Sequence, residues 1–216
     1  MTGVLFDLDG TLLNTLEDLT DGVNAVLTQF GYPLRSLEEV RRFVGNGAAR
    51  LMQLAVPKGE DWQKPLEAFQ NYYRAHCQVK TAPYPGIMEA LEEIARSCPV
   101  AIISNKPDRA VKTLCAQYFP GIYAQGETAD CPRKPAPDMV LLGMKKIGVD
   151  RCVYVGDSEV DVLTARNAGV SCLSVLWGFR EEGELRAAGA DRFCREPGDL
   201  VKELKMIMKE MENHGQ

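Results

Sequence analysis

Hydrophobic residues follow two different spacings along this chain of 216 residues, and the order of those spacings predicts its architecture. Short, continuous apolar runs bounded by turn residues are typical of strands that are buried on both faces. Stretches with apolar residues three or four positions apart are typical of helices with one buried side. After position 85 the two patterns alternate, which predicts a parallel sheet covered on both faces by helices.

The first apolar run is followed by a long block without a strand pattern. We predict a strand at 4–6 and then four helices, over 16–30, 37–44, 48–56 and 65–76. Thr15 and Asp18 have the spacing of a capping box at the start of the first helix, and Ser36 and Glu39 have the same spacing at the second. The block therefore predicts a helical insertion after the first strand.

The rest of the chain alternates between strands and helices. Strands are predicted at 100–103, 122–124, 152–155, 171–176 and 192–194, and a charged amphipathic helix over 203–212 closes the chain. We therefore expect a doubly wound, Rossmann-like α/β core formed by residues 1–14 and 84–216, with a smaller, all-helical domain at 15–83. Because the chain crosses between the two at short, neighbouring segments, a hinge is expected there.

Composition narrows the classes of partner. The chain carries 25 basic and 30 acidic residues, a net charge of -5, so bulk attraction to nucleic acid or to an anionic membrane is not expected. Met1 leads within three residues into the first strand, which leaves no room for a signal peptide, and no apolar run reaches membrane-spanning length. We expect a cytoplasmic protein, either a monomer or a homodimer.

Cysteine and histidine offer little for redox or metal chemistry. The 7 cysteines are scattered and include no CxxC pair, so they are expected to be reduced. His76 and His214 have no partner at metal-ligand spacing, which argues against a histidine metal site. Candidate chemistry must therefore come from other residue types.

The end of the first strand carries two carboxylates. Asp7 and Asp9 follow the apolar run and precede Gly10, which permits a tight turn. Aspartate and glycine are also ordinary turn residues, so a simple turn is the alternative for this segment taken alone. In a parallel α/β sheet, however, ligands bind beyond the carboxyl ends of the strands, where these acids would lie.

Three later segments place polar residues at the same edge. Ser104 and Asn105 follow one apolar run, Asp157 follows another, and Lys134 stands before a proline between them. Taken singly, Asp157 could be a helix N-cap, Lys134 a surface lysine and Ser104 a strand terminus. Parallel strands bring their carboxyl ends together, so we expect these side chains to converge with Asp7 and Asp9.

Such a group of side chains suits phosphoryl transfer. Asp7 and Asp157, with a main-chain carbonyl and water, are the hard oxygen ligands that Mg²⁺ prefers. A hydroxyl at Ser104 and an ammonium at Lys134 could neutralise the oxygens of a phosphoryl group. Asp9 is the remaining carboxylate, which could donate a proton to the leaving oxygen and later accept one from water.

The motifs resemble those of the haloacid dehalogenase superfamily. The resemblance rests on Asp7-x-Asp9-Gly10-Thr11, Ser104-Asn105, Lys134-Pro135 and Gly156-Asp157-Ser158-x-x-Asp161, which occur in the family's order. It implies that Asp7 is the nucleophile that forms an aspartyl-phosphate. It also implies that Asp9 is the general acid and base, with its main-chain carbonyl on Mg²⁺, and that Thr11 supports Asp9.

The same resemblance assigns the remaining motif residues. Ser104 and the main-chain amide of Asn105 would bind phosphate, and Lys134 would neutralise the phosphorylated nucleophile. Asp157 would bind Mg²⁺. Asp161, supported by Ser158, would order Lys134 or a metal-bound water. The presence of an acid at Asp9 argues against halide displacement, because dehalogenases of the superfamily lack this acid.

The helical insertion is similar to the cap of the phosphoglycolate phosphatase-like branch. In that branch a loop like Phe43-Val44-Gly45-Asn46-Gly47 faces the active site, so Gly45, Asn46 and Gly47 are candidate substrate contacts. A Gly-Asn-Gly run is also an ordinary helix connection. Arg180, after a later strand, is expected at the surface, with substrate contact as the alternative.

The resemblance implies a Mg²⁺-dependent phosphatase acting on a small phosphorylated metabolite, with 2-phosphoglycolate as the favoured substrate. Pyrophosphate, a nucleoside monophosphate or a sugar phosphate remain alternative substrates. A phosphomutase similar to β-phosphoglucomutase and a non-catalytic binding protein are further alternatives. The sequence does not decide which cap residues contact the substrate, whether the cap is open or closed, or the oligomeric state.

Overall fold

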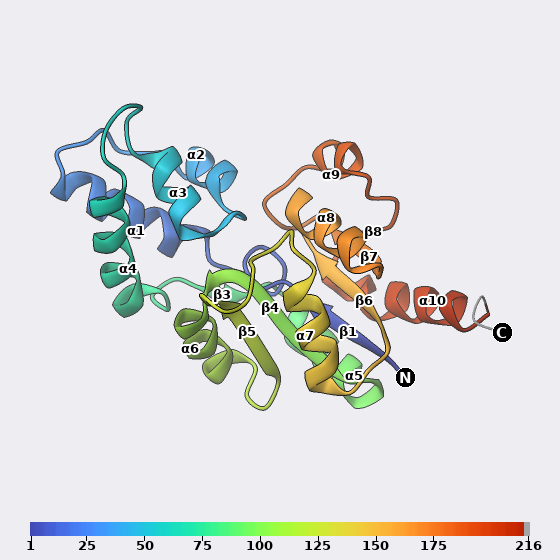
Figure 1. Ribbon diagram of the computed structural model, residues 1–216. Coiled ribbons are helices and arrows are strands. Elements are labelled where there is room, and N and C mark those ends of the chain that lie inside the picture. Colours follow the sequence, from blue (N-terminus) through green and yellow to red (C-terminus); the bar gives the residue numbers. More distant parts are fainter. Residues whose placement is uncertain (214–216) are drawn as a thin grey trace.

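The computed structural model describes residues 1–213, so His214 lies outside the described part (Figure 1). The strands are β1 (Thr2–Phe6), β2 (Leu13–Asn14), β3 (Ala82–Pro83), β4 (Val100–Pro107), β5 (Tyr123–Glu127), β6 (Arg151–Gly156), β7 (Ser171–Val175) and β8 (Phe193–Cys194). The helices are α1 (Leu16–Gln29), α2 (Leu37–Phe43), α3 (Gly47–Ala55), α4 (Gln63–His76), α5 (Ile87–Ser97), α6 (Asp108–Tyr118), α7 (Asp138–Ile147), α8 (Glu159–Ala168), α9 (Glu182–Ala188) and α10 (Leu200–Asn213), with a 3-10 turn at Pro197–Asp199. Within this part, no helix is long and apolar enough to cross a membrane.

A six-stranded parallel sheet forms the centre of the fold. Its order is β5-β4-β1-β6-β7-β8, so β1 lies inside the sheet with a partner on each side. Val4 is in register with Val100 of β4 and with Val153 of β6. The predicted α/β class and doubly wound parallel sheet are confirmed. The carboxyl ends of β1, β4 and β6 consequently lie next to one another.

Alternate residues of β1 pack against helices on opposite faces of the sheet. Phe6 belongs to the apolar cluster that contains residues of α5, α6 and α10, whereas Leu5 belongs to the cluster formed with α7 and α8. Both side chains are completely buried, and each contributes about 1.5–3 kcal/mol by leaving water. The uninterrupted apolar run in the sequence therefore reflects a strand covered on both sides.

Helices α1–α4 form a separate layer, which we call the cap, beside one end of the sheet (Figure 1). The capping box at Ser36 and Glu39 is present as predicted. The first predicted capping box is wrong, because the Thr15 side chain makes no cap hydrogen bond. The Asp18 carboxylate instead accepts from the main-chain amides of Lys80 and Thr81, which tightens the return of the chain from the cap.

The two crossings between core and cap are paired. β2 and β3 form a two-residue antiparallel ladder in which Leu13 faces Pro83 and Asn14 faces Ala82. No strand was predicted here, because two residues are too few to show an alternating pattern. The crossings lie side by side as expected, but the division into separate domains and the hinge stay predictions.

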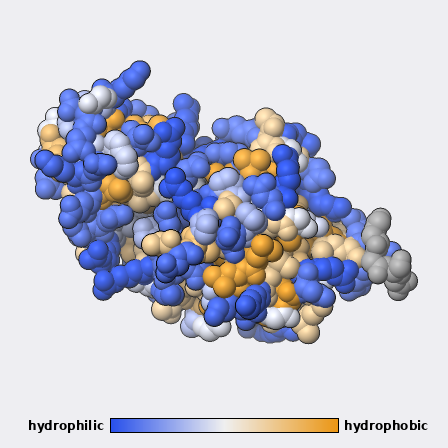
Figure 2. Space-filling view, viewed as in Figure 1, coloured by the Kyte–Doolittle hydropathy of each residue, from blue (hydrophilic) through white to orange (hydrophobic). Residues whose placement is uncertain are grey.

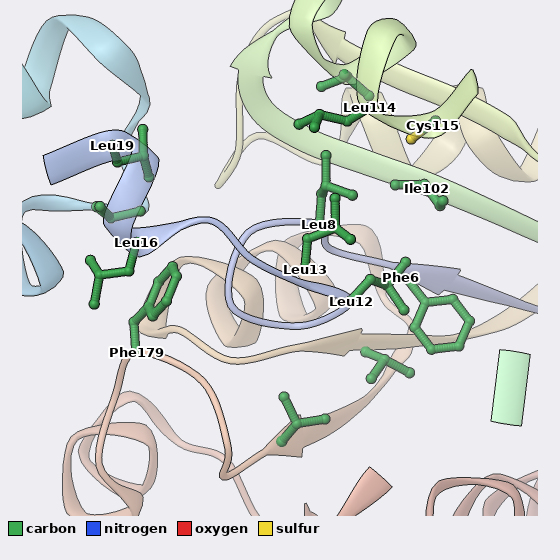
Figure 3. Close-up of a cluster of buried hydrophobic side chains, with 14 of the residues drawn as sticks. Phe6, Leu8, Leu12, Leu13, Leu16, Leu19, Ile102, Leu114, Cys115 and Phe179 are labelled. Carbon is green, nitrogen blue, oxygen red and sulfur yellow. The ribbon is translucent and has the colours of Figure 1, made fainter. Parts of the chain in front are cut away.

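Apolar side chains fix the segment between the first strand and the cap. Leu8, Leu12 and Leu13 are fully buried and point into the cluster that contains Ile102 (Figure 3). The main-chain amides of Leu12 and Leu13 both donate to the carbonyl of Leu8. The acids of this segment are therefore presented from a loop that is anchored on both sides.

Hydrophilic residues cover most of the face shown in Figure 2, and the hydrophobic area over α7 includes the half-exposed Leu141. All seven cysteines are free, as predicted.

Candidate active site

The Asp7 carboxylate lies at the end of β1, in contact with the ammonium of Lys134. Lys134 Nζ is 2.8 Å from Asp7 Oδ1, and both side chains are buried. Burial, followed by repulsion from Asp161, raises the pKa of Asp7 well above its ordinary value, although Lys134 opposes this shift. Among residues 1–213, Asp7 Oδ2 has no hydrogen-bond donor, so this oxygen is available to an electrophile or a metal ion.

Hydrogen bonds fix Lys134 both at its side-chain ammonium and at its main chain. Its Nζ also lies 2.7 Å from Asp161 Oδ1 and 2.9 Å from the Tyr154 hydroxyl. The side chain of Asn105 accepts from the Lys134 amide at 2.8 Å and donates to its carbonyl at 3.0 Å. Burial alone would lower the pKa of Lys134, but Asp161 and Asp7 raise it, so the side chain remains a cation.

Tyr154 is a site residue that the sequence analysis missed. Its hydroxyl donates to Asp161 Oδ1 at 3.0 Å, and its ring is fully buried between β6 and the helices on that face. A tyrosine inside an otherwise apolar strand run is the available signal, because a buried tyrosine hydroxyl usually requires a polar partner. Which partner it has depends on the tertiary structure.

The Asp157 carboxylate follows β6 and lies against Gly10 and Gly178. Its Oδ1 accepts from the Thr11 hydroxyl at 3.2 Å, and its Oδ2 accepts from the Phe179 amide at 2.7 Å. A Cβ atom at Gly10 would lie 2.7 Å from Asp157 Cγ, so this position has no room for a larger residue. Burial, followed by repulsion from Asp161, raises the pKa of Asp157 to about 7.

Three buried carboxylates could hold a metal ion. Asp7, Asp157 and Asp161 each offer an oxygen, and these oxygens lie within 4.8 Å of one another. Both Asp161 oxygens already accept hydrogen bonds from Lys134, Tyr154 or Ser158, whereas Asp7 keeps an oxygen without a donor. The oxygen donor set and the mutual repulsion that raises the pKa of Asp7 and Asp157 both suit a divalent cation.

The surroundings of Asp9 differ from the expectation. Thr11 was expected to support it, but the Thr11 side chain turns to Asp157 and is absent from the cavity lining. Asp9 Oδ1 instead accepts from the Thr15 hydroxyl at 2.6 Å and from Lys106 Nζ at 2.7 Å. The two threonines therefore donate to different carboxylates, which sequence spacing does not reveal.

Strand β4 continues beyond its apolar run. It was expected to end at 103, but it extends to Pro107, with an irregular register between Ile103 and Pro107. Pairing with β5 resumes at Pro107, opposite Glu127, so the polar residues between the paired positions lie within the strand. As a result, Ser104 Oγ lies 3.4 Å from Asp9 Oδ2 and faces the same space as Asp7.

A cavity of about 260 Å³ lies between the sheet edge and the cap. Its core side includes Asp7, Asp9, Ser104, Asn105, Lys106, Lys134 and Asp157. The cap contributes a mainly apolar wall, namely Leu19, Val44, Ala48, Leu51, Phe69 and Tyr73, together with Gly45, Gly47 and the polar Gln70 and Arg74. Asn46, the third residue expected in this loop, is not part of the lining.

Arg180 is buried, so its expected surface location is wrong. It lines the cavity, and its Nε lies 2.8 Å from Glu159 Oε2. Its guanidinium also donates to the carbonyls of Arg41 and Val44 in the cap. These carbonyls lie at the C-terminal end of α2, where they have no partner within the helix and attract the cation.

Comparison with known proteins identifies the family. A family model described as haloacid dehalogenase-like hydrolase matches residues 4–175. The chain belongs to the haloacid dehalogenase-like hydrolases. It is 36% identical over 191 residues to phosphoglycolate phosphatase 1 of Pseudomonas aeruginosa, covering 82% of this chain and 70% of that protein. It is 32% identical to the phosphoglycolate phosphatase of Xanthomonas campestris pv. campestris, covering 82% and 84%.

Solved structures of other haloacid dehalogenase-like proteins share the fold. A protein of Lactobacillus delbrueckii subsp. bulgaricus, provisionally assigned as a phosphoglycolate phosphatase, has a TM-score of 0.88 and 34% identity. That match covers 94% of this chain and 97% of the other. A haloacid dehalogenase-like family protein of Streptococcus pneumoniae, at 22% identity, has a TM-score of 0.85, covers 94% and 97%, and supports the fold alone. The predicted family and phosphatase class are confirmed.

Proposed function

We propose that this chain is a Mg²⁺-dependent phosphatase that hydrolyses a small phosphomonoester, with 2-phosphoglycolate as the principal substrate. The observation that carries the proposal is the geometry at Asp7. Lys134 occupies one carboxylate oxygen, and the other oxygen lies at the cavity without a donor among the described residues. A nucleophile that is oriented by a cation and still has a reactive oxygen is what covalent phosphoryl transfer requires.

In the first step, Asp7 Oδ2 forms a bond to phosphorus while the bond from phosphorus to the leaving oxygen breaks. Asp9 Oδ2 donates a proton to that oxygen, so the alcohol leaves uncharged. Ser104 Oγ and the Asn105 amide bind phosphoryl oxygens, and Lys134 balances the charge that collects at the phosphorylated carboxylate. Because Ser104 lies 3.4 Å from Asp9 Oδ2, the phosphate and the proton donor share one small region.

In the second step, Asp9 takes a proton from water as the water oxygen bonds to phosphorus. The bond between phosphorus and Asp7 then breaks, and inorganic phosphate leaves with the Asp7 carboxylate restored. Asp7, Asp157 and the Asp9 main-chain carbonyl would hold Mg²⁺, which supplies further charge neutralisation when it is bound. Asp161 acts through Lys134, to which it is directly paired.

The choice of substrate rests on the cavity and on the named relatives. About 260 Å³ lies just below the usual ~300–1,000 Å³ of ligand sites, which favours a small metabolite. Two relatives described above carry the name phosphoglycolate phosphatase. We propose that the substrate carboxylate is received by main-chain amides of the loop at Gly45 and Gly47, where α3 begins with its N-terminus at the cavity.

Phosphate release measured with 2-phosphoglycolate, with and without EDTA, tests the proposal. Chelation and Asp7→Asn should each lower activity at least ~1,000-fold, because they remove the metal and the nucleophile. Full activity of Asp7→Asn would contradict the covalent mechanism. A panel with pyrophosphate, nucleoside monophosphates and sugar phosphates tests the substrate, and isomerised sugar phosphate without free phosphate would indicate a phosphomutase.

The free cysteines support a reducing, cytoplasmic location, which we also propose.

A further inference from the structure

A second buried lysine contacts the proton carrier and has no part in the mechanism above. Lys106 Nζ lies 2.7 Å from Asp9 Oδ1, and its side chain is 4% exposed. The Thr15 hydroxyl reaches the same Oδ1 at 2.6 Å. Two donors therefore occupy one oxygen of Asp9 and leave Oδ2 as the oxygen that faces Ser104.

The orientation of Asp9 matters because its protonated carboxyl group can transfer the proton only when Oδ2 faces the leaving oxygen. A carboxylate on a loop can rotate about its side-chain bonds, and exchange of the two oxygens would move the proton carrier away from the phosphate. A cation at Oδ1 opposes that rotation, since a charge-assisted hydrogen bond is about twice as strong as a neutral one. Lys106 is thus placed to select the reactive oxygen.

Lys106 also contacts the cap. Its Nζ lies 4.7 Å from the centroid of the Tyr73 ring, a distance suited to a cation-π interaction. Tyr73 belongs to α4 and stacks on Phe69 with ring centroids 5.3 Å apart, so its ring is fixed within the cap. Lys106 therefore joins a core carboxylate to a cap aromatic ring.

We propose that Lys106 is a positioning residue for acid catalysis. It fixes Asp9 with Oδ2 toward the phosphate, and the Tyr73 ring holds Lys106 in place when the cap lies over the cavity. The inference rests on the proposed function, because it assumes that Asp9 protonates the leaving group. The competing role for a buried lysine in this cavity is direct binding of the substrate carboxylate, and the two roles make different predictions.

Four phosphate esters separate the two roles. Ethyl phosphate and 2-phosphoglycolate have alkyl leaving groups that need a proton, and 2-phosphoglycolate also carries a carboxylate. p-Nitrophenyl phosphate and 4-carboxyphenyl phosphate leave as stabilised phenolates, and the second of these carries a carboxylate. The value of kcat/KM reports the steps through departure of the leaving group, so it isolates the acid step from hydrolysis of the aspartyl-phosphate.

Lys106→Met should lower kcat/KM about 30-fold or more for both alkyl substrates, because acid catalysis typically contributes ~10²–10⁴-fold. The two aryl substrates should change less than about threefold. Lys106→Arg, which keeps the cation, should restore part of the alkyl rates. Tyr73→Leu should give a weaker loss of the same pattern, whereas Tyr73→Phe, which keeps the ring, should resemble the wild type.

Other patterns overturn the inference. A loss confined to the two carboxylated substrates, expressed as a higher KM, would assign Lys106 to substrate binding. An equal loss on all four substrates would indicate a structural role, and circular dichroism with thermal unfolding would show whether the variant is folded. Failure of the proposed function is distinguishable, because the wild type would then release no phosphate that depends on Asp7.

Discussion

Arg180 Nη2 donates to the main-chain carbonyl of Val44 at 2.7 Å, which joins the loop after β7 to the end of α2. The same guanidinium reaches the Arg41 carbonyl at 3.0 Å, and its Nε is paired with Glu159 in the core. A buried core cation thus satisfies carbonyls at the C-terminus of a cap helix. Since Val44 and Gly45 line the cavity, the position of this cap wall depends on Arg180.

Replacing Arg180 should weaken the cap contact. Arg180→Gln removes charged hydrogen bonds worth about 1.5–3 kcal/mol, so we expect KM to rise about tenfold or more with a smaller change in kcat. Hydrogen exchange should become faster in α2 and in the loop at Gly45. Arg42→Gln is the control, because that side chain is exposed and pairs with Glu38. An unchanged KM for Arg180→Gln would argue that the cap is held by other contacts.

Gly10→Ala should disable the metal site through Asp157. Gly10 has φ of +87°, and an added Cβ would overlap the Asp157 carboxylate. We expect activity to fall at least ~100-fold, together with weaker Mg²⁺ binding measured by calorimetry. Gly59→Ala is a matched control, because Gly59 has φ of +96° with open space around its Cβ position. It should cost about 1 kcal/mol of stability and leave kcat unchanged.

The effect of Mg²⁺ on stability should increase with pH. The pKa of Asp157 is raised to about 7 from an ordinary value of 3.8, because of burial and repulsion from Asp161. Protonation of this group favours the folded, metal-free protein, and that contribution is lost as the pH rises through about 7. Mg²⁺ must displace the proton, so its binding strengthens over the same range.

Thermal unfolding at pH 6 and pH 8 measures this effect. The metal-free protein should have a lower Tm at pH 8 than at pH 6, and the gain in Tm on adding Mg²⁺ should be larger at pH 8. Asp157→Asn cannot ionise at this position and should reduce both differences. An equal Mg²⁺ effect at the two pH values would contradict the role given to Asp157.

Tyr154→Phe tests the support of Lys134. The change removes the hydroxyl that bridges Lys134 Nζ and Asp161 Oδ1, and it keeps the buried ring. We expect a stability loss of about 1–2 kcal/mol in urea unfolding and a decrease in kcat of about tenfold. Tyr123→Phe is a control on the edge strand β5, where the hydroxyl contacts Gln125 outside the cavity lining. A kcat unchanged in Tyr154→Phe would show that Asp7 and Asp161 hold Lys134 without help.

The sequence predicted most elements because their signals are local. The short apolar run before Asp7, bounded by turn residues, predicts a buried strand, and the spaced apolar residues of the cap predict its helices. Local patterns do not predict the two-residue ladder of β2 and β3 or the extension of β4 to Pro107. Both depend on pairing with a distant segment rather than on any pattern of their own.

By itself, the sequence determined the fold class, the order of the strands along the chain and the acids and lysine that follow them. The tertiary structure decided which atoms meet. It pairs Asp7 with Lys134, which is 127 positions away in the sequence. The donors to Asp9 are Thr15 and Lys106 rather than Thr11. Arg180 is buried against the cap. Periodicity records which face of an element is buried, whereas side-chain partners depend on how separate elements pack, and that arrangement leaves no mark on local spacing.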